Sequence, residues 1–307
     1  MSSFTLPTRR MLAASLAATA LALTVSACGS SASTMPAMPG MDSASAMPSM
    51  SATATASAMP TMDGMGAMAS GDGLAATNGG YTLTSTTATL PAGKASGYRF
   101  TITGPNGKPV TGFAVDQTKT LHFYAIRSDL TGFQHIHPTM AADGTWTAPL
   151  AALSAGTWRL FATFTPATGS GKGTDFVLSR TLTVSGMPMD TALPAASAST
   201  TVDGYTVTLA GDLMAGMAHP LTVTITKGGK PVTNLQPYLD TYAHLTAFHS
   251  GDGAFAHLHP TTAVTGDHGG PTLSFHPELA QAGDWRLFLQ FQTAGTLHTA
   301  AITVHVS

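Results

Sequence analysis

Cysteine is nearly absent from this chain of 307 residues, since Cys28 is the only one. Cys28 lies at the end of an N-terminal leader pattern. The rest of the sequence can therefore form neither an internal disulfide nor a cysteine-based zinc site. A blue-copper site needs a cysteine thiolate and is excluded on the same ground. Any metal chemistry must use other side chains.

Charge is also scarce. Charged residues make up 9% of the sequence, and 13 Lys and Arg against 15 Asp and Glu give a formal net charge of -2. No basic stripe is present, so we expect no nucleic-acid partner. The sequence also has no glycine-rich phosphate loop and no recognisable hydrolytic triad. Abundant Thr, Gly and Ala, with no sustained period of 3.6 residues, favour an all-β fold with many turns.

The first 28 residues have the pattern of a lipoprotein export signal. Arg9 and Arg10 precede a short apolar run that is too short to span a membrane comfortably. The segment VSAC then ends at Cys28, the position at which such a leader is cut. We expect residues 1–27 to be a signal peptide and Cys28 to be lipidated. The protein would then be exported and anchored to the outer face of the cell membrane, in a periplasmic or extracellular position.

Residues 28–72 form a tract rich in Ser, Ala, Met, Pro and Gly. Nine of the 16 methionines lie between Met35 and Met68, mostly three residues apart. Prolines interrupt any helix, and the tract has little to bury, so we expect a disordered tether. Thioethers suit the capture of Cu(I). A low-complexity spacer and a methionine oxidant sink are the alternatives.

Two similar units follow the tether. LPAGKASGYRFTIT at 90–103 matches LMAGMAHPLTVTIT at 213–226, and GTWRLFATF at 156–164 matches GDWRLFLQF at 283–291. An internal repeat of this length predicts tandem domains, each long enough for its own core. The expected domains are 73–185 and 202–307, with 186–201 as a linker.

Each unit shows about seven short strand patterns separated by Gly, Pro, Asn and Asp. This spacing predicts two tandem immunoglobulin-like antiparallel β-sandwiches. The strands expected in the first unit are 81–90, 98–103, 112–116, 121–127, 133–137, 146–150 taken together with 158–164, and 176–184. Trp158 and Trp285 occupy matching positions and are interpreted as core anchors.

The same histidine triple occurs in both units, and in each case the first member lies 13 residues before the second. The triples are His122, His135 and His137 in the first unit and His244, His257 and His259 in the second. Residues i and i+2 of a strand share a face. In a hairpin, any register in which paired residue numbers sum to an odd value places all three imidazoles on one face. Register is not fixed by sequence alone.

Three imidazoles on adjacent strands can bind copper or zinc as a His₃ site. Packing or hydrogen-bonding histidines near a sheet edge are the alternative. The second unit adds Met217 and His219 in the segment LMAGMAHP. Because thioether with imidazole suits Cu(I), these two residues are candidates for a distinct second site. The alternative there is an exposed turn with incidental Met and His.

The segments FQHIHP (133–138) and FAHLHP (255–260), the tandem β units and the Met-rich tract resemble exported bacterial copper-homeostasis lipoproteins. Their modules are immunoglobulin-like, of the copper-resistance protein C and YtkA-like type. The resemblance covers residues 80–305 and implies metal handling without specifying the metal. It departs from copper-resistance protein C in one respect. A signal and tether precede the fold, so no N-terminal copper clamp of amine and histidine is expected.

The function expected from these patterns is a non-enzymatic, lipid-anchored copper-binding protein for sequestration, tolerance or delivery. Copper, as Cu(II) or Cu(I), is the leading ion and zinc the alternative. The expected partners are the metal ion, the membrane and another copper-handling protein. A copper- or zinc-dependent oxidoreductase resembling superoxide dismutase is the second hypothesis, although no bridging His with a nearby Asp is recognisable. A cupin enzyme is disfavoured because Ala141 and Ala263 stand where Glu is needed. A metal-free surface interaction module is the third hypothesis.

Overall fold

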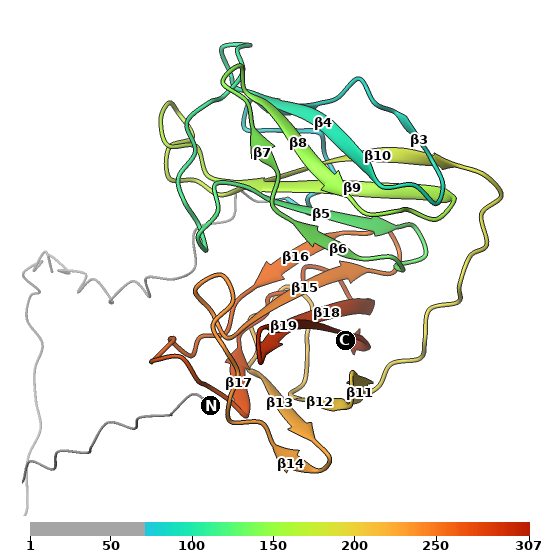
Figure 1. Ribbon diagram of the computed structural model, residues 1–307, viewed down its shortest axis with the longest axis vertical. Helices are drawn as coiled ribbons and strands as arrows, with labels where there is room; N and C mark the ends of the chain where they lie inside the picture. Colours follow the sequence, from blue (N-terminus) through green and yellow to red (C-terminus); the bar gives the residue numbers. More distant parts are fainter. Residues whose placement is uncertain (1–70) are drawn as a thin grey trace, which may run out of the picture. The chain divides into compact units, whose positions relative to one another are not determined.

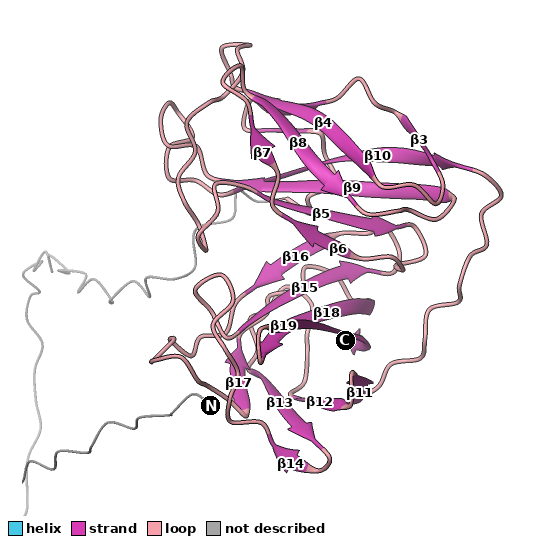
Figure 2. Ribbon diagram, viewed as in Figure 1, coloured by secondary structure: helices cyan, strands magenta, loops and turns pink. Residues whose placement is uncertain are grey.

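Every regular element in residues 71–307, which this computed structural model describes, is a β-strand (Figure 2). The signal peptide expected at 1–27, the lipidation site Cys28 and the methionine tract between Met35 and Met68 lie outside the described residues. Within residues 71–307 no helix has the length and apolar character needed to cross a membrane.

The first repeat contains β1 to β10, labelled in Figure 1. Their bounds are β1 (Thr77–Asn78), β2 (Tyr81–Thr84), β3 (Thr89–Pro91), β4 (Ser96–Thr103), β5 (His122–Arg127), β6 (Gln134–Ile136), β7 (Thr139–Met140), β8 (Thr145–Leu150), β9 (Gly156–Phe164) and β10 (Phe176–Ser185). They form two five-stranded sheets, ordered β1-β2-β4-β8-β7 and β3-β10-β9-β5-β6. All neighbours are antiparallel except β3 and β10, which run parallel. This is the strand arrangement of an immunoglobulin-like sandwich.

The second repeat contains β11 to β19. Their bounds are β11 (Ser199–Val202), β12 (Tyr205–Ala210), β13 (Leu221–Lys227), β14 (Lys230–Pro231), β15 (Ala243–His249), β16 (Phe255–Leu258), β17 (Thr272–Phe275), β18 (Gly283–Thr293) and β19 (Thr296–Val306). One sheet has the order β11-β12-β13-β14 with β17 also paired to β13, and the other has the order β16-β15-β18-β19. The predicted tandem of all-β immunoglobulin-like sandwiches is therefore confirmed.

Two of the expected strands differ from the structure. The range 81–90 is divided, because β2 joins the β4 sheet whereas β3 pairs with β10. At the break the Ser85 hydroxyl donates to the Arg99 carbonyl at 2.7 Å and accepts from the Thr87 N–H at 3.1 Å, which bends the chain between the sheets. The range 112–116 is not a strand. It makes only isolated bridges, from Phe113 to Pro166 and from Asp116 to Lys119.

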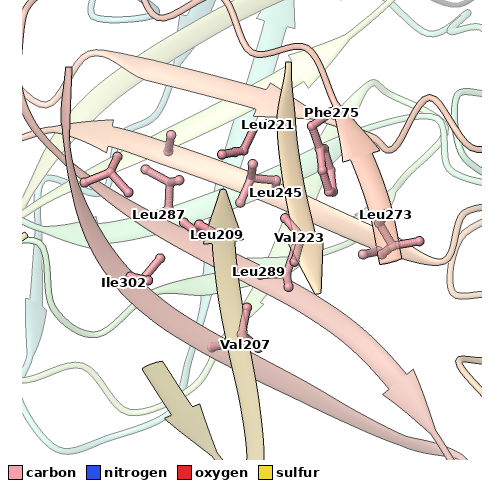
Figure 3. Close-up of a cluster of buried hydrophobic side chains, with 14 of the residues drawn as sticks. Val207, Leu209, Leu221, Val223, Leu245, Leu273, Phe275, Leu287, Leu289 and Ile302 are labelled. Carbon is pink, nitrogen blue, oxygen red and sulfur yellow. The ribbon is translucent and has the colours of Figure 1, made fainter. Parts of the chain in front are cut away.

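Each repeat has its own apolar core between its two sheets. Figure 3 shows that of the second repeat, where Val207, Val223 and Leu289 lie among the labelled side chains. Trp158 and Trp285 are only 2% and 1% exposed, so their predicted role as core anchors is confirmed. In both repeats the indole N–H donates at 2.9 Å to a carbonyl four residues earlier in the chain.

Strands β5 and β15 are buried on both faces. In β5, Phe123 and Ala125 face the core of the first repeat, whereas Tyr124 and Ile126 belong to a separate apolar cluster. This third cluster joins the two repeats, whose strands all belong to one compact unit, Pro60–Ser307. Its buried members are Tyr124, Ile126, Leu130, Phe161 and Val177 from the first repeat and Phe248, Phe255 and Phe288 from the second. We call it the inter-repeat cluster.

Candidate metal centre

The β5–β6 hairpin brings the first histidine triple together. Tyr124 pairs with His135 and Phe123 with Ile136, so the paired residue numbers have an odd sum. The prediction that an odd register places the three imidazoles on one face is confirmed. Gly132 helps to close this hairpin, because it has a φ of 70° and a Cβ there would collide with the ring of Trp158.

The second triple is assembled in the same way. Leu245 pairs with Leu258 across β15 and β16, which is again an odd sum. In each triple one nitrogen from each imidazole lies within 4.8 Å of the other two. We call the two groups the first triad (His122, His135, His137) and the second triad (His244, His257, His259).

Nitrogen atoms converge within both triads. In the first triad, His122 Nδ1 lies 3.1 Å from His135 Nε2. In the second, His257 Nε2 lies 3.4 Å from His244 Nδ1 and 3.0 Å from His259 Nε2. Nitrogens that share a tetrahedral zinc ion at about 2.0–2.1 Å lie about 3.3 Å apart. The spacing of these donors therefore fits a common ion.

Backbone carbonyls fix the tautomer of the first histidine in each triad. His122 Nε2 lies 3.1 Å from the Asp116 carbonyl, and His244 Nε2 lies 3.1 Å from the Tyr238 carbonyl. A carbonyl only accepts, so each Nε2 carries the proton and donates it. Each Nδ1 is left with a free lone pair that faces its triad. A hydrogen bond of this kind, behind the ligating nitrogen, commonly orients metal-binding histidines.

Two tight turns hold these carbonyls. Gln117 and Thr118 follow Asp116 with φ of 44° and 65°, and Leu239 and Asp240 follow Tyr238 with φ of 54° and 58°. Two consecutive residues with positive φ are typical of a type I′ hairpin turn, usually made by Asn and Gly. Neither turn contains glycine. Non-glycine residues held in this region cluster at functional sites, and here both repeats use them at the matching position.

The second histidine of the first triad, His135, is hydrogen-bonded to the other repeat. Its Nδ1 lies 2.7 Å from Gln290 Oε1, on β18 of the second repeat, and the Gln290 amide NH₂ donates to Thr299. With the amide in this orientation, His135 Nδ1 donates to Gln290 Oε1 and Nε2 carries no proton. The 3.1 Å contact from His122 Nδ1 to His135 Nε2 then joins two lone pairs. Two facing lone pairs repel each other, and a cation between the nitrogens would relieve that repulsion.

His137 adds a third donor without a partner. Its Nε2 is buried and makes no hydrogen bond in the described part of the chain. A buried polar nitrogen normally finds a partner, since leaving one unsatisfied costs about 1–3 kcal/mol. The three nitrogen donors of the first triad are thus better placed to coordinate one metal ion than to hydrogen-bond to one another.

Burial keeps these imidazoles neutral. Burial first, and then the nearby His122, lower the pKa of His137 and of His259 to about 4. The pKa values of His135, His244 and His257 lie well below 6.5, with burial as the main cause and the nearby imidazoles as the second. Neutral imidazole is the form that ligates metal. Both triads are therefore in the ligating state at neutral pH.

Met217 and His219 lie elsewhere. His219 belongs to neither triad, its backbone N–H donates to the Pro277 carbonyl at 3.3 Å, and Met217 is 51% exposed. A distinct site at these two residues stays a prediction. The roles of the Asp116 and Tyr238 carbonyls and of Gln290 could not be predicted from the sequence. No Asn-Gly signal marks the turns, and Gln290 comes from the other repeat.

The chain matches one family model, described as "Domain of unknown function (DUF8832)", at residues 75–181 and again at 200–307. No curated relative matches it. Similar solved structures include a tetra-tandem repeat from the extending region of a large adhesion protein, 14% identical over 74% of this chain and 49% of the other, with a TM-score of 0.24. The Escherichia coli adhesin FdeC is 16% identical over 74% of this chain and 64% of the other, with a TM-score of 0.23.

The Ig1-2 module of the Drosophila receptor protein tyrosine phosphatase DLAR is 9% identical over 74% of this chain and 98% of the other, with a TM-score of 0.21. These values carry no argument about function. The chain spans 49% and 64% of the two adhesin structures. The family match is of a different kind, because its two segments together cover more than half of the sequence. The protein therefore belongs to the DUF8832 family and carries two copies of that domain.

Proposed function

We propose that this protein binds transition-metal ions through its two histidine triads. The observation that supports this most strongly is the 3.1 Å contact between His122 Nδ1 and His135 Nε2, two nitrogens whose protons are committed elsewhere. The second triad has the same carbonyl-fixed tautomer at His244. The donors are positioned by strand register and by turns in the described residues, so the sites are largely pre-formed.

Copper is the leading ion and zinc the alternative. Imidazole suits both, and Cu(II) has the higher affinity of the two in the usual order of divalent metals. Hard oxygen-seeking ions are disfavoured, because neither triad contains a carboxylate. The methionine tract lies outside the described residues, and its proposed capture of Cu(I) is an independent element of the copper hypothesis.

The proposed role is non-enzymatic sequestration, tolerance or delivery of copper by an exported, lipid-anchored protein. The leader pattern ending at Cys28 supports export, and the resemblance to copper-homeostasis lipoproteins supports the role. The matching family is not described as a copper family. The proposal therefore depends on the site chemistry. The oxidoreductase alternative gains no support in residues 71–307, where neither triad includes an aspartate ligand.

A metal-free surface interaction module is the second candidate. The tandem of immunoglobulin-like sandwiches supports this candidate, because many cell-surface domains share that architecture. One observation within the site also favours it. His257 Nε2 and His259 Nε2 lie 3.0 Å apart, an ordinary hydrogen-bond distance, so one of these rings can donate to the other without any ion. In this case the histidines would serve only the contact between the repeats.

Metal titration of the purified full-length chain tests the proposal. Cu(II) and Zn(II) are suitable probes, because the methionine thioethers of the chain favour Cu(I) and should compete little with the triads for these two ions. We expect tight binding to the wild type, and its loss in the double variant His137→Ala/His259→Ala. The variant His268→Ala is the matched control, because this histidine is exposed and belongs to neither triad. Equal weak binding by all three proteins would favour the metal-free module.

A further inference from the structure

The two triads lie against each other. Between them, the ring centroids of His135 and His244 are 5.7 Å apart, and those of His135 and His257 are 5.8 Å apart. The ring centroids of His122 and His257 are 6.2 Å apart. Within the triads the corresponding separations run from 4.8 to 5.4 Å. The gap between the triads is therefore only slightly wider than the spacing inside each one, and the imidazoles form a single cluster.

The contacts across this cluster are reciprocal. His122 corresponds to His244 and His135 to His257, so the pairs His122–His257 and His135–His244 are the same contact in both directions. The inter-repeat cluster repeats this pattern. Phe133 stacks on Phe288 with centroids 4.4 Å apart, and the matching rings of Phe255 and Phe161 lie 4.9 Å apart.

A reciprocal contact of this kind is what two identical subunits make in a two-fold dimer. Here it occurs within one chain. The aromatic packing is buried, and the 2.7 Å hydrogen bond from His135 to Gln290 crosses directly from one repeat to the other. The relative position of the two triads is thus fixed by the same side chains that hold the repeats together.

We propose that the two triads form one dinuclear metal centre across the inter-repeat interface, with one ion held by each triad and the two ions close enough to couple. This inference rests on the proposed function and adds that the sites are not independent. The cluster supplies three imidazoles to each ion and no bridging carboxylate. It therefore brings two cations together with neutral donors only.

That charge balance has a measurable consequence. Two cations in this partly buried site repel each other, and neither triad contributes a negative side chain to offset the repulsion. The first ion therefore binds more tightly than the second, although the two triads have the same ligands. Removing one triad should leave the other with the affinity of the first binding step.

A Cu(II) titration of the full-length chain, followed by electron paramagnetic resonance, tests this inference. Up to one equivalent we expect the spectrum of an isolated Cu(II) ion. The second equivalent should broaden the spectrum and lower the signal per ion, because two nearby unpaired spins couple. Two ions that give twice the signal of one, with no broadening, would overturn the shared centre and leave metal binding intact.

Single-triad variants supply the matched comparison. His137→Ala and His259→Ala each remove one part-buried ligand that lies just beyond its strand, and each variant should bind one Cu(II) with an unbroadened spectrum. His137→Gln and His259→Gln repeat the test with polar replacements, and thermal unfolding confirms that each variant is folded. His268→Ala should behave as the wild type. If the wild type binds only one Cu(II), and if either single variant loses it, the six imidazoles form one shared site and the two-ion centre is overturned. Absence of any binding would overturn the proposed function itself.

Discussion

The first and second triads use the same three ligands but have different neighbours. In the first, the ring of Tyr124 stacks on His135 with centroids 4.5 Å apart and an angle of 16° between the planes. In the second, the matching position is Thr246, whose hydroxyl hydrogen-bonds to His257 at 3.2 Å. His135 is also held by Gln290 of the other repeat, whereas the position that matches Gln290 in the first repeat is Thr163.

The two repeats share some features of the triads and differ in others. Strand register, the tight turn before the first histidine and the carbonyl that fixes its tautomer are the same in both repeats. The side chains that contact the second histidine of each triad, His135 and His257, differ between the repeats. Hydrogen bonds behind the ligands commonly change metal affinity by about 10–100-fold. Equal ligands thus do not predict equal sites.

Substitution of the two buried tryptophans, Trp158 and Trp285, should have the largest effect on stability, and the effect should be similar in the two repeats. We expect Trp158→Ala and Trp285→Ala each to lower the free energy of unfolding by about 3–5 kcal/mol, as large-to-small changes of buried aromatic residues do. Both indoles are almost fully buried and make the same hydrogen bond to a carbonyl four residues earlier. Denaturant unfolding measures the loss. A loss confined to one variant would show that the two cores are not equivalent.

Acid should destabilise the metal-free protein through both triads. Unfolded histidine binds a proton below pH about 6.5. In the folded protein the pKa of His137 and of His259 is about 4. Between pH 4 and pH 6.5 the unfolded state therefore binds more protons than the folded state. The free energy of unfolding is thus highest above pH about 6.5 and decreases as the pH falls towards 4. Thermal unfolding in a chelator, from pH 7.5 to 4.5, should show the decline.

The variant His137→Ala/His259→Ala should flatten that pH profile, because it removes two of the groups that bind a proton only after unfolding. The single variants should flatten it by similar amounts, since the two pKa values are alike. An unchanged slope in the double variant would mean that the remaining buried histidines carry the whole effect.

The hydrogen bond between the repeats distinguishes the first site from the second. We expect Gln290→Ala to weaken Cu(II) binding at the first triad by about 10–100-fold, because His135 loses the acceptor that fixes its tautomer. The matched change Thr163→Ala should alter binding at the second triad less, since His257 bonds instead to Thr246. Titration of each variant in a background that lacks the opposite triad measures the two affinities separately. Equal losses would contradict the comparison.

The smallest effect concerns the strained turns. Thr118 and Asp240 are exposed residues with φ of 65° and 58° at matching positions. Glycine adopts this backbone without strain, so Thr118→Gly should stabilise the protein by about 1 kcal/mol or less. Asp240→Gly should have a smaller effect, because Asp tolerates positive φ better than a β-branched residue does. Thermal unfolding of both variants compares them.

Much of this architecture could be predicted from the sequence. The internal repeat, the short strand patterns and the turn residues predicted the tandem sandwiches, whereas the sequence did not fix the odd register of the histidine hairpin. The division of 81–90 between two sheets could not be predicted, because the hydrogen bond at the break, from Ser85 to the Arg99 carbonyl, joins residues 14 positions apart. The segment 112–116 has the composition of a strand but lies where only isolated bridges form.

The contact between the repeats escaped prediction for a different reason. Every residue of β5 is buried, so its sequence does not show which face belongs to the first core and which to the second repeat. The side chains of that second face, among them Tyr124 and Phe161, are ordinary strand residues. Gln290 lies 155 residues from His135, and only the folded chain brings the two together.

The reciprocal contact between the repeats also bears on ancestry. A surface on which His122 meets His257 while His135 meets His244 could join two separate copies of one domain equally well. Placing both copies in one chain makes the association independent of protein concentration. It also frees each half to mutate alone, which identical subunits cannot do. Tyr124 facing one triad and Thr246 facing the other are a difference that a symmetric pair of single domains could never acquire.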